Sequence, residues 1–157
     1  MSRLIHPFLL IGCLTCWAPP LQSACPVSIP NLPDPDGALR SGDRWGWFGT
    51  AELAAMIPAD GHWYGMGKHN QYADKWWWWR QGYNARQEAL PELSITGRRL
   101  DSGAPPLVVG QATNGFQQDW DAMLVGPAFP AAGCWEIVGR YRDRELKIVL
   151  QVGHPAR

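Results

Sequence analysis

Short apolar runs separated by Gly, Pro, Asn and Asp dominate the chain beyond residue 44. Runs of this length, bounded by turn residues, are typical of β-strands. The pattern therefore predicts an all-β domain over residues 45–157. We expect its strands at residues 45–48, 62–66, 75–80, 93–96, 107–109, 123–125, 134–141 and 146–152.

The clearest predicted element is a C-terminal hairpin. Apolar and polar residues alternate from Leu146 to Val152, which places one set of side chains on a buried face. Residues 134–141 provide the matching strand, and we expect the turn at Arg142-Asp143-Arg144-Glu145. In this register Cys134 points away from the face that carries Trp135.

Residues 25–44 are rich in Pro, Asp, Gly and Ser, so we expect an extended arm. Good helix formers occur at 50–57, but Pro58 ends that segment, and we expect a turn of helix or an irregular strand there. Residues 81–90 are a second, weaker helix candidate. The whole pattern predicts an immunoglobulin-like two-sheet sandwich with an extended N-terminal arm.

Residues 1–24 have the pattern of a signal peptide. Arg3 supplies a positive charge, residues 4–17 are largely apolar, and small residues precede a cut at Cys25. The apolar stretch is shorter than the ~20 residues that span a bilayer, so we expect no transmembrane segment. An alternative is a lipobox at Leu10-Ile11-Gly12-Cys13, whose cysteine would become an acylated N-terminus.

Cleavage near Ala24 leaves two cysteines in the mature chain, Cys25 and Cys134. An exported chain meets an oxidising compartment, where thiols pair. We predict a disulfide between these two residues, which would fasten the arm to the start of the last hairpin. The alternative is two free buried thiols.

Charge and motifs narrow the classes of function. Basic and acidic residues balance at 14 each, and no stretch gathers Lys or Arg into a stripe that could follow phosphates, so we expect no nucleic-acid partner. The sequence contains no Gly-x-Ser-x-Gly, no His-Glu-x-x-His and no phosphate-binding glycine loop. The local carboxylate pairs have the spacing of turn residues. We expect neither an enzyme nor a cofactor.

The most unusual feature is the run Trp76, Trp77, Trp78, Trp79, followed by Arg80. On a strand the indoles alternate, two to each face, so one pair enters the core. The other pair either packs beneath the arm or the 58–61 loop, with Arg80 covering an indole, or forms an exposed ligand platform. In the second case Arg80 would bind an anionic group of the ligand.

His62, Met66 and His69 combine imidazole and thioether groups, a ligand set suited to copper. Their spacing matches no strong signature, and the neighbouring glycines place them in a turn or loop. A metal site normally needs three or four converging ligands. We therefore expect polar loop residues here and keep periplasmic copper binding as an alternative.

Several strings along the mature chain resemble a group of uncharacterised bacterial secreted proteins and lipoproteins with an immunoglobulin-like domain and a C-terminal Gly-Cys-Trp-Glu strand. The resemblance implies an exported domain, often anchored near a membrane, with no assigned activity, and it is compatible with a bond between Cys25 and Cys134. The chain departs from the group at residues 45–67. The matching strings are Cys25 to Asn31, Trp78 to Arg80, Thr96 to Asp101, Ala104 to Pro106, Gly115 to Gln117, Phe129-Pro130 and Gly133 to Ile137.

These observations predict an exported, non-enzymatic β-sandwich protein with a structural or interaction role at the bacterial cell envelope. We expect it in the periplasm or outside the cell, either free or anchored as a lipoprotein. The alternative from another class is a carbohydrate or cell-wall binding module that uses exposed tryptophans.

Overall fold

The computed structural model describes residues 24–36, 38–65, 72–117 and 120–153. These residues form an all-β structure, and none of them lies in a helix, so no helix in this part of the chain could cross a membrane. The predicted lipobox at Cys13 lies outside the described residues. The strands are β1 (Trp45–Thr50), β2 (Leu53–Pro58), β3 (His62–Trp63), β4 (Tyr72–Ala73), β5 (Trp76–Trp79), β6 (Leu93–Arg99), β7 (Val108–Val109), β8 (Thr113–Gln117), β9 (Trp120–Val125), β10 (Pro127–Phe129), β11 (Gly133–Tyr141) and β12 (Arg144–Val152).

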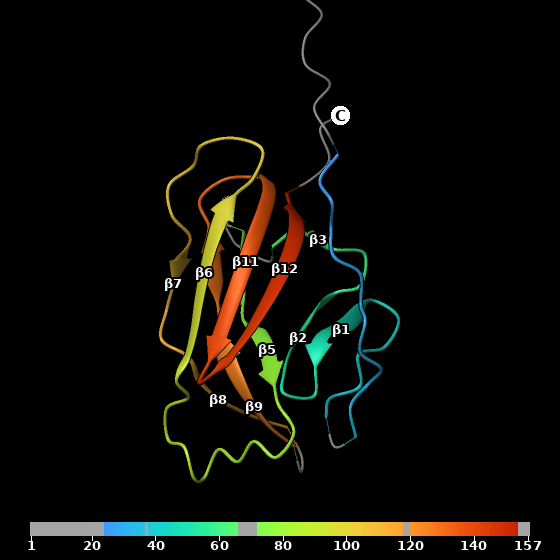
Figure 1. Ribbon diagram of the computed structural model, residues 1–157, viewed down its shortest axis with the longest axis vertical. Helices are drawn as coiled ribbons and strands as arrows, with labels where there is room; N and C mark the ends of the chain where they lie inside the picture. Colours follow the sequence, from blue (N-terminus) through green and yellow to red (C-terminus); the bar gives the residue numbers. More distant parts are fainter. Residues whose placement is uncertain (1–23, 37, 66–71, 118–119, 154–157) are drawn as a thin grey trace, which may run out of the picture.

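The strands form two large sheets and a small one. The five-stranded sheet has the order β1-β2-β5-β9-β8, the four-stranded sheet β3-β12-β11-β6, and the small sheet β4-β10-β7. Figure 1 shows β6, β11 and β12 side by side in front of β5, β8 and β9. The pairings of the named strands are antiparallel, except that β3 runs parallel to β12.

The main hydrophobic core lies between the two large sheets. It takes Trp78 from β5 of one sheet and Trp135 and Ile137 from β11 of the other, all fully buried. Burying a large apolar side chain of this kind stabilises a fold by about 1.5–3 kcal/mol. Gly139 of β11 lies directly against Trp78, since a Cβ at that glycine would come within 2.3 Å of the indole Cη2.

The predicted C-terminal hairpin is confirmed. Strands β11 and β12 pair from Gly133 with Val152 to Tyr141 with Arg144. The turn is tighter than expected, because it consists of Arg142 and Asp143 alone. Arg142 adopts a left-handed conformation, with φ of 54°, which few residues other than glycine do.

The segment with helix formers is a strand, β2. Its residues from Leu53 to Ile57 are all buried, because the strand lies inside the sheet with apolar packing on both faces. Tertiary packing of this kind overrides the helix propensity of Ala and Leu. Residues 81–90 form turns and bends. The pattern also missed β4, β8 and β10, whose short runs do not stand out from the loops around them.

The predicted extended arm is present and runs along the outer edges of both large sheets (Figure 1). The Ser28 backbone N–H donates to Val149 O of β12 at 2.8 Å, and the Val149 N–H donates to Ser28 Oγ at 2.9 Å. Further along, Leu32 forms a β-bridge with Trp47 of β1. The Asn31 side chain bonds both backbone groups of Gly49. Covering open strands in this way suppresses edge-to-edge association.

The arm is fastened at its start by a disulfide between Cys25 and Cys134, which confirms the predicted pairing. Cys134 is buried and is the second residue of β11. Two glycines let the arm approach closely. A Cβ at Gly46 would lie 2.5 Å from Pro30 Cγ, and one at Gly61 would lie 2.8 Å from Val27 Cβ.

Candidate functional site

The tryptophan run forms β5, between β2 and β9 in the five-stranded sheet. Side chains alternate along a strand, so Trp76 and Trp78 point to one face and Trp77 and Trp79 to the other. Trp76 and Trp78 lie in the main core and are almost fully buried. These two indoles are therefore part of the hydrophobic core.

Trp77 and Trp79 pack on the opposite face, in a second apolar cluster with Trp47 and Trp120. The Trp47 indole donates a hydrogen bond of 3.0 Å to the Leu39 carbonyl of the arm. Trp79 is 7% exposed and Trp77 is half-buried, so the run has the arm-covered packing and does not present an exposed pair of indoles. The arm residues that pack against this cluster are Leu32, Ala38 and Leu39.

Arg80 alternates to the other side and reaches the β11–β12 hairpin. Its Cζ lies 5.9 Å from the centroid of the Tyr141 ring, and Arg142 Cζ lies 5.1 Å from the same centroid. The Arg80 Nε–H donates to Gln81 O at 3.3 Å. The expected cation–π contact of Arg80 is thus made with a phenol and not with an indole.

These residues surround a hollow of 460 Å³, which we call the arginine pocket. Arg142 forms an ion pair of 3.1 Å with Glu88, and Arg144 one of 3.0 Å with Glu52. Arg80 forms no ion pair with any described carboxylate. The pocket is lined by Ala51, Glu52, Arg80, Gln81, Gly82, Tyr141, Arg142, Asp143 and Arg144.

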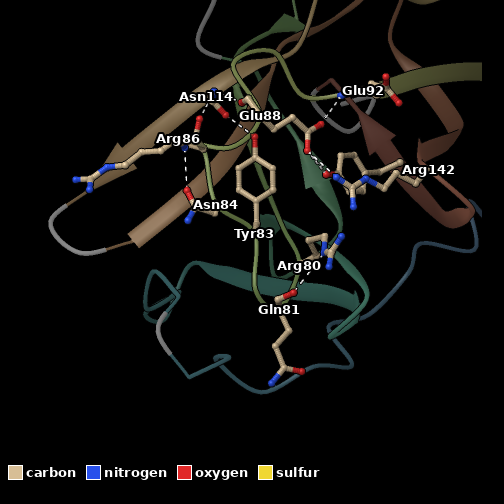
Figure 2. A network of polar contacts seen from close by, with 11 residues as sticks. Arg80, Gln81, Tyr83, Asn84, Arg86, Glu88, Glu92, Asn114 and Arg142 are labelled. Carbon is tan, nitrogen blue, oxygen red and sulfur yellow. Dashed lines mark hydrogen bonds and ion pairs between the residues drawn. The ribbon is translucent and has the colours of Figure 1, made fainter.

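A polar network fixes the loop that follows Arg80 (Figure 2). The Tyr83 hydroxyl bonds the Asn114 side-chain oxygen, and the Asn114 amide donates to the Glu88 carbonyl at 2.8 Å. The Glu88 carboxylate accepts from the Tyr141 hydroxyl and from Arg142. The loop is thereby tied to β8 and to the last hairpin at once.

Charge and burial shift the pKa of the groups in this network. Burial would raise the pKa of Glu88, but hydrogen bonds from Tyr141 and the Glu92 N–H, together with Arg142, hold it below its usual value. Burial and the nearby negative charge of Glu88 raise the pKa of Tyr83 to about 12. Burial also raises the pKa of Tyr141, as does its hydrogen bond to Glu88. Both phenols therefore act as neutral donors at ordinary pH.

A second hollow of 470 Å³, the aromatic pocket, lies on the other side of Gln81 and Gly82. Phe116 of β8 is its most exposed ring, at 63%. Asp121 accepts a hydrogen bond of 2.9 Å from the Ala85 N–H, which positions the loop over β9. The pocket is lined by Asp36, Trp79, Gln81, Gly82, Tyr83, Asn84, Arg86, Phe116, Trp120 and Asp121.

Of the residues that the sequence predicted to bind a ligand, only Trp79 and Arg80 line these two pockets. Sequence reasoning missed Phe116, Trp120 and Tyr141 as site residues. Exposure of Phe116 depends on what the loop after β5 leaves uncovered, and the position of Tyr141 depends on strand register. Gly115-Phe116 belongs to one of the strings that carry the resemblance, and its large aromatic side chain was the other signal.

The copper candidates are only partly visible, because Met66 and His69 lie outside the described residues. The Nδ1 of His62 lies 2.8 Å from the Asp60 carbonyl oxygen, which can only accept, so Nδ1 carries the proton. Within the described part of the chain, no three His, Cys, Asp or Glu residues are grouped to hold a metal ion. His62 lines a separate hollow of 740 Å³ with Trp45 and Tyr64.

Comparisons with protein-family models, with curated proteins and with solved structures found no match to this chain. The geometry of the two pockets is therefore the basis for a functional proposal.

Proposed function

We propose that this protein is an exported, non-enzymatic module that contacts the bacterial cell envelope by holding carbohydrate in the aromatic pocket. The observation that carries the proposal is the lining of that pocket, where the exposed ring of Phe116 shares one hollow with Trp79, Tyr83 and Trp120. Aromatic rings pack against the apolar faces of sugars, and a few convergent polar groups orient the ligand.

The aromatic pocket also contains polar groups that can orient a ligand. Gln81, Asn84 and Arg86 offer amide and guanidinium donors beside the rings, and Asp36 offers an acceptor. The hollow of 470 Å³ lies within the range of about 300–1,000 Å³ that small-ligand sites occupy. A sugar ring with its hydroxyl groups suits this mixture better than a wholly apolar ligand.

Two nearby carboxylates, those of Asp121 and Glu88, already have hydrogen-bonding tasks, which supports binding over catalysis. Asp121 holds the Ala85 N–H, and Glu88 is engaged by Tyr141, Arg142 and the Glu92 N–H. Glycoside hydrolysis requires two carboxyl groups on opposite sides of the scissile bond. Carboxylates engaged in holding a loop are poorly suited to that role.

The disulfide between Cys25 and Cys134 supports export, since disulfides persist in oxidising compartments and are rare in the cytosol. Two large sheets that enclose one core support an immunoglobulin-like sandwich as the finer description of the fold. The disulfide differs from that of antibody domains because it joins the arm to β11 and does not cross the core.

Titration with soluble neutral glycans and peptidoglycan fragments tests the proposal. Trp79 and Trp120 lie in the wall of the pocket, so binding should change tryptophan fluorescence with saturation. The substitution Phe116→Ala should weaken binding roughly tenfold, because it removes the exposed aromatic face. Val108→Ala is the matched control, since Val108 is 66% exposed on β7 and does not line the pocket. Unchanged fluorescence with every glycan would contradict the proposal.

A further inference from the structure

Arg80 differs from the arginines of β6 and the β11–β12 hairpin because it is half-buried and has no carboxylate partner among the described residues. A half-buried guanidinium without a counter-ion has lost part of its hydration and gained no ion pair in exchange. Such a group gains an ion pair when it binds an anion, and it has already lost part of its hydration. The arginines that do have partners are Arg98, Arg99, Arg140, Arg142 and Arg144.

A second cation lies beside it. Arg80 and Arg142 both lie over the ring of Tyr141, with Cζ to centroid distances of 5.9 and 5.1 Å. Both arginines line the arginine pocket, and of the two only Arg142 has a carboxylate partner in the described part of the chain, that of Glu88. An anion in this pocket would give Arg80 a counter-ion and accept charge-assisted hydrogen bonds from the guanidiniums that line it.

The charges that line the arginine pocket indicate the kind of anion. Three arginines, Arg80, Arg142 and Arg144, face two carboxylates, Glu52 and Asp143. Among the described residues, Arg142 is paired with Glu88 and Arg144 with Glu52 and Asp143, so Arg80 is the one guanidinium of the pocket left for a ligand, and a group with a single negative charge matches it. The planar fork of a guanidinium matches a carboxylate group in shape.

The arginine pocket adjoins the aromatic pocket, because Gln81 and Gly82 line both. Gly82 has φ of +70°, and a Cβ built there would meet no atom within 4 Å, so no side chain stands over this shared residue. A ligand that stacks a sugar ring in the aromatic pocket can place its next group at Arg80.

We infer that the arginine pocket is an anion subsite and that the ligand is a carboxylate-bearing glycan, with its carboxylate between Arg80 and Arg142. The inference rests on the proposed function, because it names the class of glycan held at the neighbouring pocket. Uronic acid polymers and the carboxylates of peptidoglycan fragments share this chemistry, and the experiment separates them.

The test compares oligogalacturonate with its methyl ester, which keeps the sugar rings and removes the charge. The wild-type protein should bind the acid roughly tenfold more tightly than the ester, with a preference that shrinks at high salt. Arg80→Gln should abolish the preference and leave ester binding unchanged. Arg80→Lys should retain part of it, since lysine keeps the charge without the fork.

Arg98→Gln is the matched control, because it removes the same charge from β6 at the end distant from the hairpin turn and should preserve the preference. Muramyl peptides, tested in the same way, decide the source. Arg80-dependent binding of these alone would assign the carboxylate to peptidoglycan.

Equal binding of acid and ester, or a preference that survives Arg80→Gln in a folded variant, would overturn the anion subsite and leave the aromatic pocket standing. Failure of the acid, the ester, the muramyl peptides and neutral glycans alike would overturn both proposals. Phe116→Ala should weaken acid and ester equally, which separates the two pockets.

Discussion

Trp78 and Gly139 show how single residues set the spacing of the two large sheets. The indole of Trp78 occupies the space that a side chain at position 139 would need, so glycine on β11 is required by the tryptophan on β5. Interiors are packed closely enough that even one added methyl group forces shifts. Trp78 of the tryptophan run therefore constrains a residue 61 positions later in the chain.

Glu88 is the residue that fixes the loop after β5. Its carboxylate accepts from the Tyr141 hydroxyl, the Arg142 guanidinium and the Glu92 N–H, so one side chain joins the loop to the last hairpin. Those donors favour its ionised form and lower its pKa below that of an unfolded chain.

Protonation of Glu88 should therefore destabilise the fold. A carboxyl group with a lowered folded-state pKa contributes stability that is present above the unfolded value of 4.5 and lost as the pH falls through the folded value. We expect Glu88→Gln to reduce the loss of unfolding free energy between neutral pH and acid, as measured by urea denaturation. Glu92→Gln, on the same loop with an exposed side chain, is the control and should keep the wild-type slope. Identical slopes for Glu88→Gln and the wild type would exclude this role.

At the scale of elements, the arm covers the open side of β1 and a part of β12 that the short β3 leaves unpaired. It pairs with β12 through Ser28 and with β1 through Leu32, and its apolar residues cover the second tryptophan cluster. An arm so rich in proline cannot fold alone, and its conformation comes from the strands beneath it. The disulfide keeps it in place at one end.

The double substitution of Cys25 and Cys134 by alanine should lower the free energy of unfolding by about 4 to 5 kcal/mol, since the bond spans 109 residues. Urea denaturation with and without a reductant provides the measurement. The wild-type protein should lose stability when reduced, and the variant should not respond to the reductant. A urea midpoint of the wild-type protein that does not change on complete reduction would show that the disulfide does not stabilise the fold.

At the scale of the whole molecule, the bonded cysteines connect the fold to the compartment in which it forms. The arm begins directly after the predicted leader, so the leader must be removed or remain tethered beside the disulfide. We expect export and folding to be linked, because the bond that holds the arm forms in an oxidising environment.

The mass of the protein recovered from the periplasm or the medium of an expressing bacterium checks this prediction. We expect a chain that begins at Cys25 and is lighter than its reduced form by two hydrogens, or one that begins at an acylated Cys13. Reduced full-length chains found only in the cytoplasm would contradict export.

Local alternation predicted the strands that have one clear buried face, such as β11 and β12. It did not decide between helix and strand for β2, because a strand buried on both faces carries the same Ala, Leu and Met that favour a helix. It did not predict β8 and β10, because their short runs do not stand out from the loops around them. For the candidate site, the run at Trp76 to Arg80 was visible in the sequence, whereas its covering by the arm was not.

The sequence by itself determined the all-β class, the last hairpin, the extended arm and the cysteine pair, since each depends on residue type and on spacing along the chain. Only the tertiary structure decided which tryptophans are buried, which edges the arm covers, and that Arg80 meets Tyr141 and Arg142. Those outcomes depend on contacts between residues distant in the chain, which register and packing select together and which no local pattern records.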